Sequence, residues 1–228
     1  MSEGAAAVLR AVQAELRRPR APLPAVTVSW ARSAEGAIAT EDGRPLAISG
    51  PQSLLLTHEL RAAHDAILVG ISTVLADDPL LSVRLVPGQP RQPQTVVLDS
   101  RLRFPAAARL LARADVKPWI FFHDSAPAAA AALEARGARL FRVPGGPGGL
   151  DLYAVLKALH GEGVRSVMVE GGARVLRSFI ASGFADQLVV TTSPSRARGL
   201  VGPDVPALVR ELTVAAGADT VSWGTLNA

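Results

Sequence analysis

The sequence predicts an α/β fold with a mostly parallel central sheet and helices on both faces. Short apolar runs recur at 65–70, 95–99, 118–122 and 166–170, and three of them end in glycine or an acidic residue, namely Gly70, Asp99 and Glu170. Stretches with helical spacing of apolar residues lie between these runs. Strands that are apolar at nearly every position are buried on both faces, which is typical of a parallel sheet covered by helices.

The N-terminal residues predict a separate helix. Ala5, Leu9, Val12 and Leu16 repeat at helical spacing, which indicates an amphipathic helix over 4–18. The proline-containing stretch that follows is typical of a linker. We therefore expect residues 1–22 to form an N-terminal helix and linker, and residues 23–228 to form a single domain.

The remaining elements follow from capping residues and apolar patterns. Ser49 is expected to cap a helix that runs from about Pro51 to Ala63, and Asp151 to cap a helix over 151–161. Further elements are expected as a strand at 24–31, a short extended piece at 37–40, a helix near 126–136, and edge strands at 187–191 and 219–226 that can pair antiparallel.

The composition excludes several classes of site. The chain has no cysteine, which rules out disulfides, thiolate zinc sites, iron–sulfur clusters and a cysteine nucleophile. Its four histidines show no metal-binding spacing, so no metal site is expected, although magnesium bound by Asp or Glu stays open. The net charge of +4 is dispersed and aromatic residues make up only 4%, which argues against nucleic-acid binding.

The distribution of charge also bears on location. No apolar run reaches the ~18 residues that cross a bilayer. Arg10, Glu15, Arg17 and Arg18 interrupt the apolar N-terminal positions, unlike a secretory signal. We therefore expect a cytoplasmic protein that does not bind membranes.

Two glycine turns are candidates for phosphate binding, because ligands of open α/β sheets bind at the carboxyl ends of the strands. Gly70 ends a strand, and Ser72 and Thr73 then offer hydroxyl groups. The second turn combines an acid, two glycines and a cation on the first helical turn, in Glu170, Gly171, Gly172 and Arg174. Each turn also fits ordinary tight packing between a strand and a helix.

Two further strand ends carry polar groups. Ser100 and Arg101 follow a strand directly and suit an additional phosphate such as that of NADP, although Asp-Ser is also common in turns. Asp77 and Asp78 are adjacent in the chain, so one can face a cleft while the other braces the loop. We assign Asp77 to the cleft, with a solvated turn as the alternative.

The glycine-rich stretch 143–149 is expected to be a mobile surface loop outside the site. It contains neither lysine nor a hydroxyl residue that would bind phosphate, and its prolines lack N–H donors.

Together these segments resemble the pyrimidine-reductase family of riboflavin biosynthesis, which has a dihydrofolate-reductase-like fold. Residues 56–79 are similar to the family signature LR…DAILVGxxTVxxDDPxLxxR, which Leu81 and Arg84 complete. Val97–Ser100 and Val169–Gly172 follow in the family's order, and the likeness covers roughly residues 24–192.

The resemblance implies transfer of a hydride from NADPH to C1′ of a phosphoribosylaminopyrimidine, which yields a ribitylamine. It implies Asp77 and Glu170 as candidates for proton transfer, and a homodimer. The implied substrate-binding residues are Ser33, Ser49, Arg61, Leu81 and Arg84, and the implied NADPH-binding residues are Gly70, Ser72, Thr73, Ser100, Arg101, Gly171, Gly172 and Arg174.

The chain departs from the family pattern at two places. It has Glu35 within Ser33–Gly36, where the family often reads SLDG, and Ser29 where the bifunctional deaminase-reductases carry a lysine. Residues 26–33 instead resemble the stand-alone fungal and archaeal reductases. Because a zinc deaminase of this type needs a Cys-x-x-Cys pair, this cysteine-free chain carries at most the reductase activity.

Two other interpretations stay open. One is a dihydrofolate-reductase-like enzyme that acts on a different pterin or pyrimidine. The other is a catalytically impaired homologue that binds NADPH without turnover, which the changes at Ser29 and Glu35 motivate. Turnover assays on the phosphoribosylaminopyrimidine and on dihydrofolate separate these interpretations.

Overall fold

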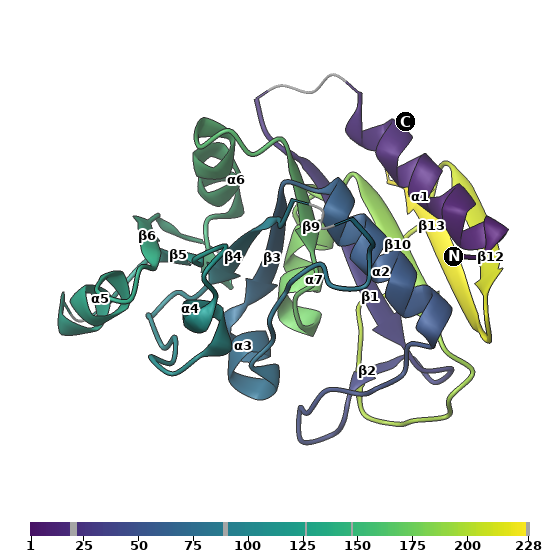
Figure 1. Ribbon diagram of the computed structural model, residues 1–228, viewed down its shortest axis with the longest axis horizontal. Helices are drawn as coiled ribbons and strands as arrows, with labels where there is room; N and C mark the ends of the chain where they lie inside the picture. The colour runs from purple at the N-terminus through teal and green to yellow at the C-terminus, as the bar shows by residue number, and fades with distance from the viewer. Residues whose placement is uncertain (19–21, 89–90, 126, 147, 227–228) are drawn as a thin grey trace.

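One twisted nine-stranded sheet forms the centre of the molecule (Figure 1), as a computed structural model describes it for residues 1–18, 22–88, 91–125, 127–146 and 148–226. From β10 to β6 neighbouring strands are parallel, and β13 pairs antiparallel with both β10 and β12. In spatial order the strands are β12 (Glu211–Ala216), β13 (Asp219–Thr225), β10 (Gln187–Thr192), β1 (Ala25–Arg32), β9 (Ser166–Val169), β3 (Ala66–Gly70), β4 (Gln94–Leu98), β5 (Trp119–Phe122) and β6 (Arg139–Arg142).

Helices cover both faces of the sheet, because alternate side chains of the buried strands point to opposite sides. Leu68 and Val167 pack with α6 and α7 in one core cluster. Ile67 and Met168 pack on the other face, with the remaining helices. The helices are α1 (Glu3–Leu16), α2 (Pro51–Ala63), α3 (Ile71–Asp77), α4 (Arg109–Ala112), α5 (Pro127–Glu134), α6 (Leu152–Gly161) and α7 (Ala173–Ala181).

Two short ribbons lie outside the main sheet. Strand β2 (Ala37–Ala39) pairs antiparallel with β11 (Leu200–Val201). Strand β7 (Gly145–Gly146) pairs antiparallel with β8 (Gly149–Leu150). The second ribbon lies in the stretch expected to be a surface loop.

The N-terminal helix packs on the body of the protein. Its residues Ala5, Val8 and Val12 are fully buried and share a core cluster with residues of α2 and β13. Figure 1 shows α1 lying beside α2, β12 and β13. Residues 19–21 of the expected linker lie outside the described part of the chain.

Three sequence expectations about the fold are wrong. Strands β10 and β13 are not at an edge, because β10 lies between β1 and β13 and β13 lies between β10 and β12. The edge strand is β12, which the sequence pattern did not indicate. Strand β6, at the opposite edge, was also missed. Helix α2 has Gly50, not Ser49, as its N-cap, and Gly50 has no side chain to cap the helix; its N–H donates to buried Asp219 at 2.7 Å.

A buried chain of hydrogen bonds ties four elements together. Trp223 Nε1 donates to Gln187 Oε1 at 2.7 Å, and Gln187 Nε2 donates to Thr27 Oγ1 at 2.9 Å. His64 contacts Thr27 Oγ1 through Nε2 and the Leu60 carbonyl through Nδ1, each at 2.7 Å. The carbonyl accepts only, so Nδ1 carries the proton and Thr27 donates to Nε2. Burial lowers the pKa of His64 to about 4, although its bond to Leu60 opposes this.

The buried neutral His64 should make stability depend on pH. The folded pKa lies below the ordinary value of 6.5. The unfolded chain therefore binds the proton first as the pH falls. We expect this group to remove about 3 kcal/mol of unfolding free energy between roughly pH 6.5 and pH 4. In urea titrations over this range, H64Q should show a shallower fall than the wild type, and an unchanged slope would contradict the assignment.

The carboxyl ends of β3 and β9 come unusually close to helix α7. A Cβ atom built on Gly70 would lie 2.7 Å from Val175 Cγ2. A Cβ atom on Gly171 would lie 2.7 Å from Val175 Cβ and 3.4 Å from the Gly70 nitrogen. Glycine at both positions therefore allows two turns that are far apart in sequence to pack side by side, with both in contact with Val175.

This contact predicts a compensating pair of substitutions. G70A should destabilise the protein by about 1–3 kcal/mol through overpacking. V175A removes the methyl group that the new Cβ meets, so G70A should be less destabilising in the V175A background than alone. Denaturant unfolding of the two single variants and the double variant gives this coupling. Additive effects would show that the valine does not set the requirement for glycine.

Candidate active site

The strand ends open into one cavity of about 1250 Å³. It is lined by residues at or just after the carboxyl ends of five adjacent parallel strands. In the order β1, β9, β3, β4 and β5, these are Ala31, Glu170, Gly70, Ser100 and His123. Segments that are distant in sequence therefore contribute to a single site.

The middle of the cavity is built by the two glycine turns. The Gly172 N–H donates to Thr73 Oγ1 at 3.2 Å and joins the turns directly. Helix α7 begins here with Gly172 as its N-cap and without a side-chain cap, so its first N–H groups are available to an anion. Ser72 and Arg174 also line this part. The arrangement fits a phosphate or diphosphate group.

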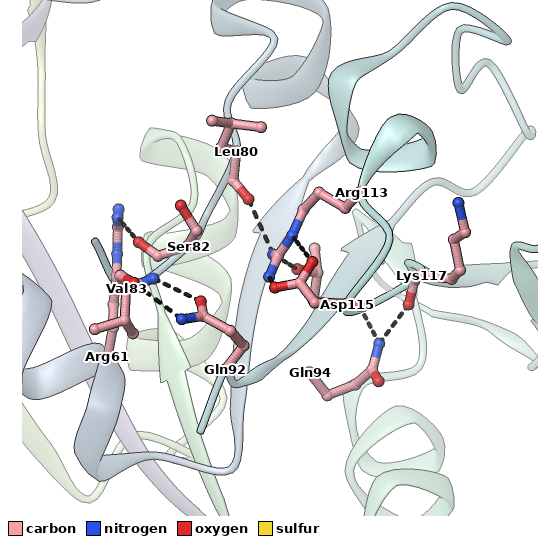
Figure 2. Close-up of polar contacts among 10 residues, drawn as sticks. Arg61, Leu80, Ser82, Val83, Gln92, Gln94, Arg113, Asp115 and Lys117 are labelled. Atoms are coloured by element: carbon pink, nitrogen blue, oxygen red, sulfur yellow. Dashed lines mark hydrogen bonds and ion pairs between the residues drawn. The ribbon is translucent and has the colours of Figure 1, made fainter. Parts of the chain in front are cut away.

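Glu170 is held by a buried guanidinium. Arg61 on α2 donates through Nε and Nη2 to the two carboxylate oxygens at 2.8 and 2.6 Å, and through Nη1 to the Ser82 carbonyl at 3.3 Å. Figure 2 shows Arg61 directed at the loop segment that carries Ser82 and Val83. Burial alone would lower the pKa of Arg61, but attraction to Glu170 and their hydrogen bond raise it. The pair therefore fixes a carboxylate at the cavity wall.

The two adjacent acids after α3 have different surroundings. Asp77 lines the cavity, and partial burial raises the pKa of its carboxyl group. Asp78 has a left-handed backbone with φ of 38°, and its Oδ1 accepts the Arg109 N–H at 2.8 Å. Asp77 therefore faces the site, whereas Asp78 braces the loop against α4.

The outer end of the cavity lies beyond β4 and β5. It is lined by Ser100, Arg101 and Arg103, by His123 and Asp124, and by Gly148 and Gly149. The expectation that the glycine-rich stretch lies outside the site is therefore wrong. The sequence pattern missed it because the stretch lacks phosphate-binding side chains, while its position depends on the β7–β8 pairing and on contacts with neighbouring strand ends.

Several residues that the family resemblance implies for the substrate do not line the cavity. Ser33 is fully buried, and its hydroxyl donates to the Ala197 carbonyl at 2.6 Å. Leu81 belongs to the core, with 4% of its surface exposed. The Arg84 N–H donates to His58 Nδ1 at 3.2 Å while its side chain is exposed. Arg61 lies behind Glu170, and of this group only Ser49 lines the cavity.

The wall next to β1 and α2 carries residues that no motif indicated. They are mostly apolar and come from strands, a loop and a helix that meet only in the folded chain. They include Trp30, Ile38, Ile48 and Leu54. Ser29, where the sequence departs from the family pattern, and Thr57, within the family signature, line the same wall.

The described residues contain no group of three or more His, Cys, Asp or Glu side chains arranged to hold a metal ion. Within the same residues, no helix has both the length and the apolar character needed to cross a membrane.

Known sequences and structures resemble this chain over most of its length. The 2,5-diamino-6-ribosylamino-4(3H)-pyrimidinone 5′-phosphate reductase of Methanothermobacter thermautotrophicus is 39% identical over 173 residues, 75% of this chain and 78% of the relative. RibD of Aquifex aeolicus is 35% identical over 171 residues, 75% of this chain and 46% of that protein, so the chain spans about half the length of this relative.

Solved structures share the fold. The riboflavin biosynthesis reductase Rib7 of Saccharomyces cerevisiae aligns with a TM-score of 0.75 and 22% identity, over 92% of this chain and 93% of Rib7. RibD of Acinetobacter baumannii aligns with a TM-score of 0.75 and 23% identity, over 89% of this chain and 58% of RibD. The expected α/β fold, with a mostly parallel sheet, is thereby confirmed. Because the RibD C-terminal domain profile matches residues 24–220, this chain belongs to the RibD C-terminal domain family.

Proposed function

We propose that the protein reduces the ribosyl group of a 5-phosphoribosylaminopyrimidine to the ribityl form, with NADPH as the hydride donor. One observation carries this proposal: a single cavity joins a double glycine turn, the cationic Ser100–Arg101 turn and two carboxyl groups, Asp77 and Glu170. The substrate class follows the name of the M. thermautotrophicus relative.

The residues present fit a nicotinamide dinucleotide. The diphosphate belongs at the start of α7, where Gly172 leaves the backbone open and Thr73 adds a hydroxyl group. Ser100 and Arg101 would hold the 2′-phosphate that distinguishes NADPH from NADH. When bound, NADPH supplies the hydride.

The substrate must open before it can be reduced. Opening breaks the bond from C1′ to the ring oxygen, puts a proton on that oxygen, and removes a proton from the nitrogen to leave an imine. Hydride addition at C1′ and protonation of the nitrogen then give the ribitylamine. We assign proton donation to Asp77, because its raised pKa favours the protonated form that a general acid needs.

Glu170 has a different role in this proposal. Its carboxylate accepts two hydrogen bonds from Arg61, which hold both carboxylate oxygens in place. A fixed negative charge at the cavity wall stabilises the positive charge that develops at C1′ and the nitrogen during opening. Arg61 is thus a positioning residue for Glu170. We propose Arg84, exposed on the loop that Arg61 contacts, for the 5-phosphate.

We also propose that the protein acts as a homodimer in which C-terminal strands pair between subunits. Strand β12 supports this, because it forms an edge of the main sheet and, within the described residues, has a neighbouring strand on only one side of its backbone.

Loss of the Asp77 carboxyl group should remove most of the activity. D77N should lower the rate of the reductive step by about 10²–10⁴-fold, the usual contribution of general acid catalysis. The wild-type rate should fall as the pH rises through the pKa of Asp77, and D77N should lose this dependence. Single-turnover oxidation of NADPH with the phosphoribosylaminopyrimidine measures both.

The neighbouring acid provides a matched control. D78N removes a carboxylate that contacts the Arg109 N–H rather than the cavity, so it should keep the wild-type pH profile. A D78N rate as low as that of D77N would contradict the division of roles. Dihydrofolate, tested in the same assay, should not be reduced.

Arg101 should determine the preference for NADPH. R101A removes a guanidinium at the outer end of the cavity, so NADPH should bind about tenfold more weakly while NADH binding stays unchanged. Calorimetric titration with both dinucleotides measures this. R136A, an exposed residue outside the cavity lining, should change neither affinity. Equal losses for NADPH and NADH would remove Arg101 from the 2′-phosphate subsite.

A further inference from the structure

The glycine hairpin is defined as residues 143–150 without the undescribed residue 147. It lines the outer end of the cavity through Gly148, Gly149 and Leu150. Its base is anchored: the Val143 N–H donates to the Phe122 carbonyl at 2.9 Å, and the Asp151 N–H donates to the Pro144 carbonyl at 3.0 Å. Leu150 is buried in the core. These contacts hold the hairpin beside the ends of β4 and β5.

The hairpin faces two polar strand ends. A Cβ atom built on Gly149 would lie 3.5 Å from Ser100 Oγ, and one on Gly145 would lie 3.4 Å from the His123 ring. The N–H groups of His123 and Asp124 both donate to the Ser100 carbonyl, at 3.2 and 2.9 Å. The Ser100 turn, His123 and the hairpin therefore surround one compartment of the cavity.

The tip of the hairpin leaves this compartment open. Gly148 lines the cavity with φ of +78°, and no atom lies within 4 Å of a Cβ built on it. Gly149 also lines the cavity and has φ of +158°. Both residues thus present only backbone to the space above Ser100.

Strand order indicates which part of a dinucleotide reaches this compartment. The turn at Gly171 follows β9, and Ser100 follows β4, two strands further along the sheet. With ~4.8 Å between strands, the two turns are roughly 10 Å apart. An adenosine attached to a diphosphate at Gly171 spans this separation. The ribose of a dinucleotide held in this way would lie between Ser100 and the glycine hairpin.

The charges of the compartment favour an anion. Arg101 and Arg103 line it from the turn after β4, and Arg103 Nε lies 4.0 Å from the carboxylate of buried Asp99. Asp124 is the opposing acid in the lining, after the next strand. Because Arg103 already lies near Asp99, Arg101 is the guanidinium group that this turn offers to an anion, with Asp124 after the next strand.

We propose that the glycine hairpin is the second wall of a subsite for a ribose phosphate monoester, and that Gly148 determines specificity by keeping this wall free of charge and bulk. The proposal rests on the proposed use of NADPH. The hydrogen-bond donors for the phosphate come from the residues that follow the strands, and the hairpin leaves the space that the phosphate occupies.

Two nearly isosteric substitutions separate charge from shape. Asn and Asp both tolerate a positive φ, and they differ in one negative charge. Calorimetric titration of G148D and G148N with NADPH and with NADH isolates the effect of that charge. We expect G148D to bind NADPH about tenfold more weakly than G148N, with equal affinities for NADH. The difference should shrink at high salt.

A distant glycine controls for a general effect of added charge. Gly163 also has a positive φ, of +87°, and open space around a built Cβ. It precedes β9, however, and so lies at the amino ends of the parallel strands, whereas the cavity lies at their carboxyl ends. G163D should leave NADPH affinity unchanged. Equal NADPH affinities of G148D and G148N would overturn the role of the hairpin, as would an equal loss for NADH. A wild-type protein that binds neither dinucleotide would overturn the proposed function itself.

Discussion

The site depends on a close approach that only residues without a Cβ permit. Gly70 and Gly171 both lie against Val175, with hypothetical Cβ contacts of 2.7 Å at each position. This approach lets the turns after β3 and β9 pack side by side, and the Gly172 N–H then reaches the Thr73 hydroxyl. The start of α7, the carboxylate of Glu170 and the helix that leads to Asp77 are all placed by these turns. A side chain larger than glycine at either turn would move the groups that we propose for catalysis and for phosphate binding relative to each other.

A second constraint keeps the two acids of the cavity distinct. Arg61 fixes Glu170 and is itself fixed by the Ser82 carbonyl. The loop that carries Ser82 has little regular structure in its described residues, yet side chains hold its backbone at Leu80, Ser82 and Val83 (Figure 2). Gln92 exchanges two hydrogen bonds with Val83, and Arg113 donates to the Leu80 carbonyl. The position of Glu170 is therefore supported from outside the cavity, whereas the surroundings of Asp77 act on it through burial, which raises the pKa of its carboxyl group.

The sequence could predict those parts of the site whose chemistry is local. The apolar strands, the glycine turns and the division between Asp77 and Asp78 depend on neighbouring residues, and the fold class follows from their repetition. Long-range pairing was not predictable in the same way. Strand β10 reads as an edge strand because nothing local shows that β13 pairs with its far side. Arg61 suits a phosphate when seen alone, and only the folded chain brings Glu170 within 2.6 Å of it. Ser33 is a similar case, because its partner is the carbonyl of Ala197, far along the chain.

The glycine hairpin shows why a motif search by residue type is incomplete. Such a search tests whether a segment contains side chains that donate hydrogen bonds to phosphate, and this segment contains none. A ligand in a cavity, however, needs walls as well as donors, and the two can come from different segments. Ser100, Arg101 and Arg103 supply polar groups after β4, while Gly148 and Gly149 supply the space opposite them. The order of strands across the sheet therefore determines the order of chemical groups along the cavity. Carboxyl groups lie near β9 and β3, backbone without side chains lies at the glycine turns after these strands, and guanidinium groups lie opposite glycine backbone beyond β4. A ligand long enough to span these strands would contact all three zones at once, which supports the proposal of a phosphorylated dinucleotide over a shorter anion.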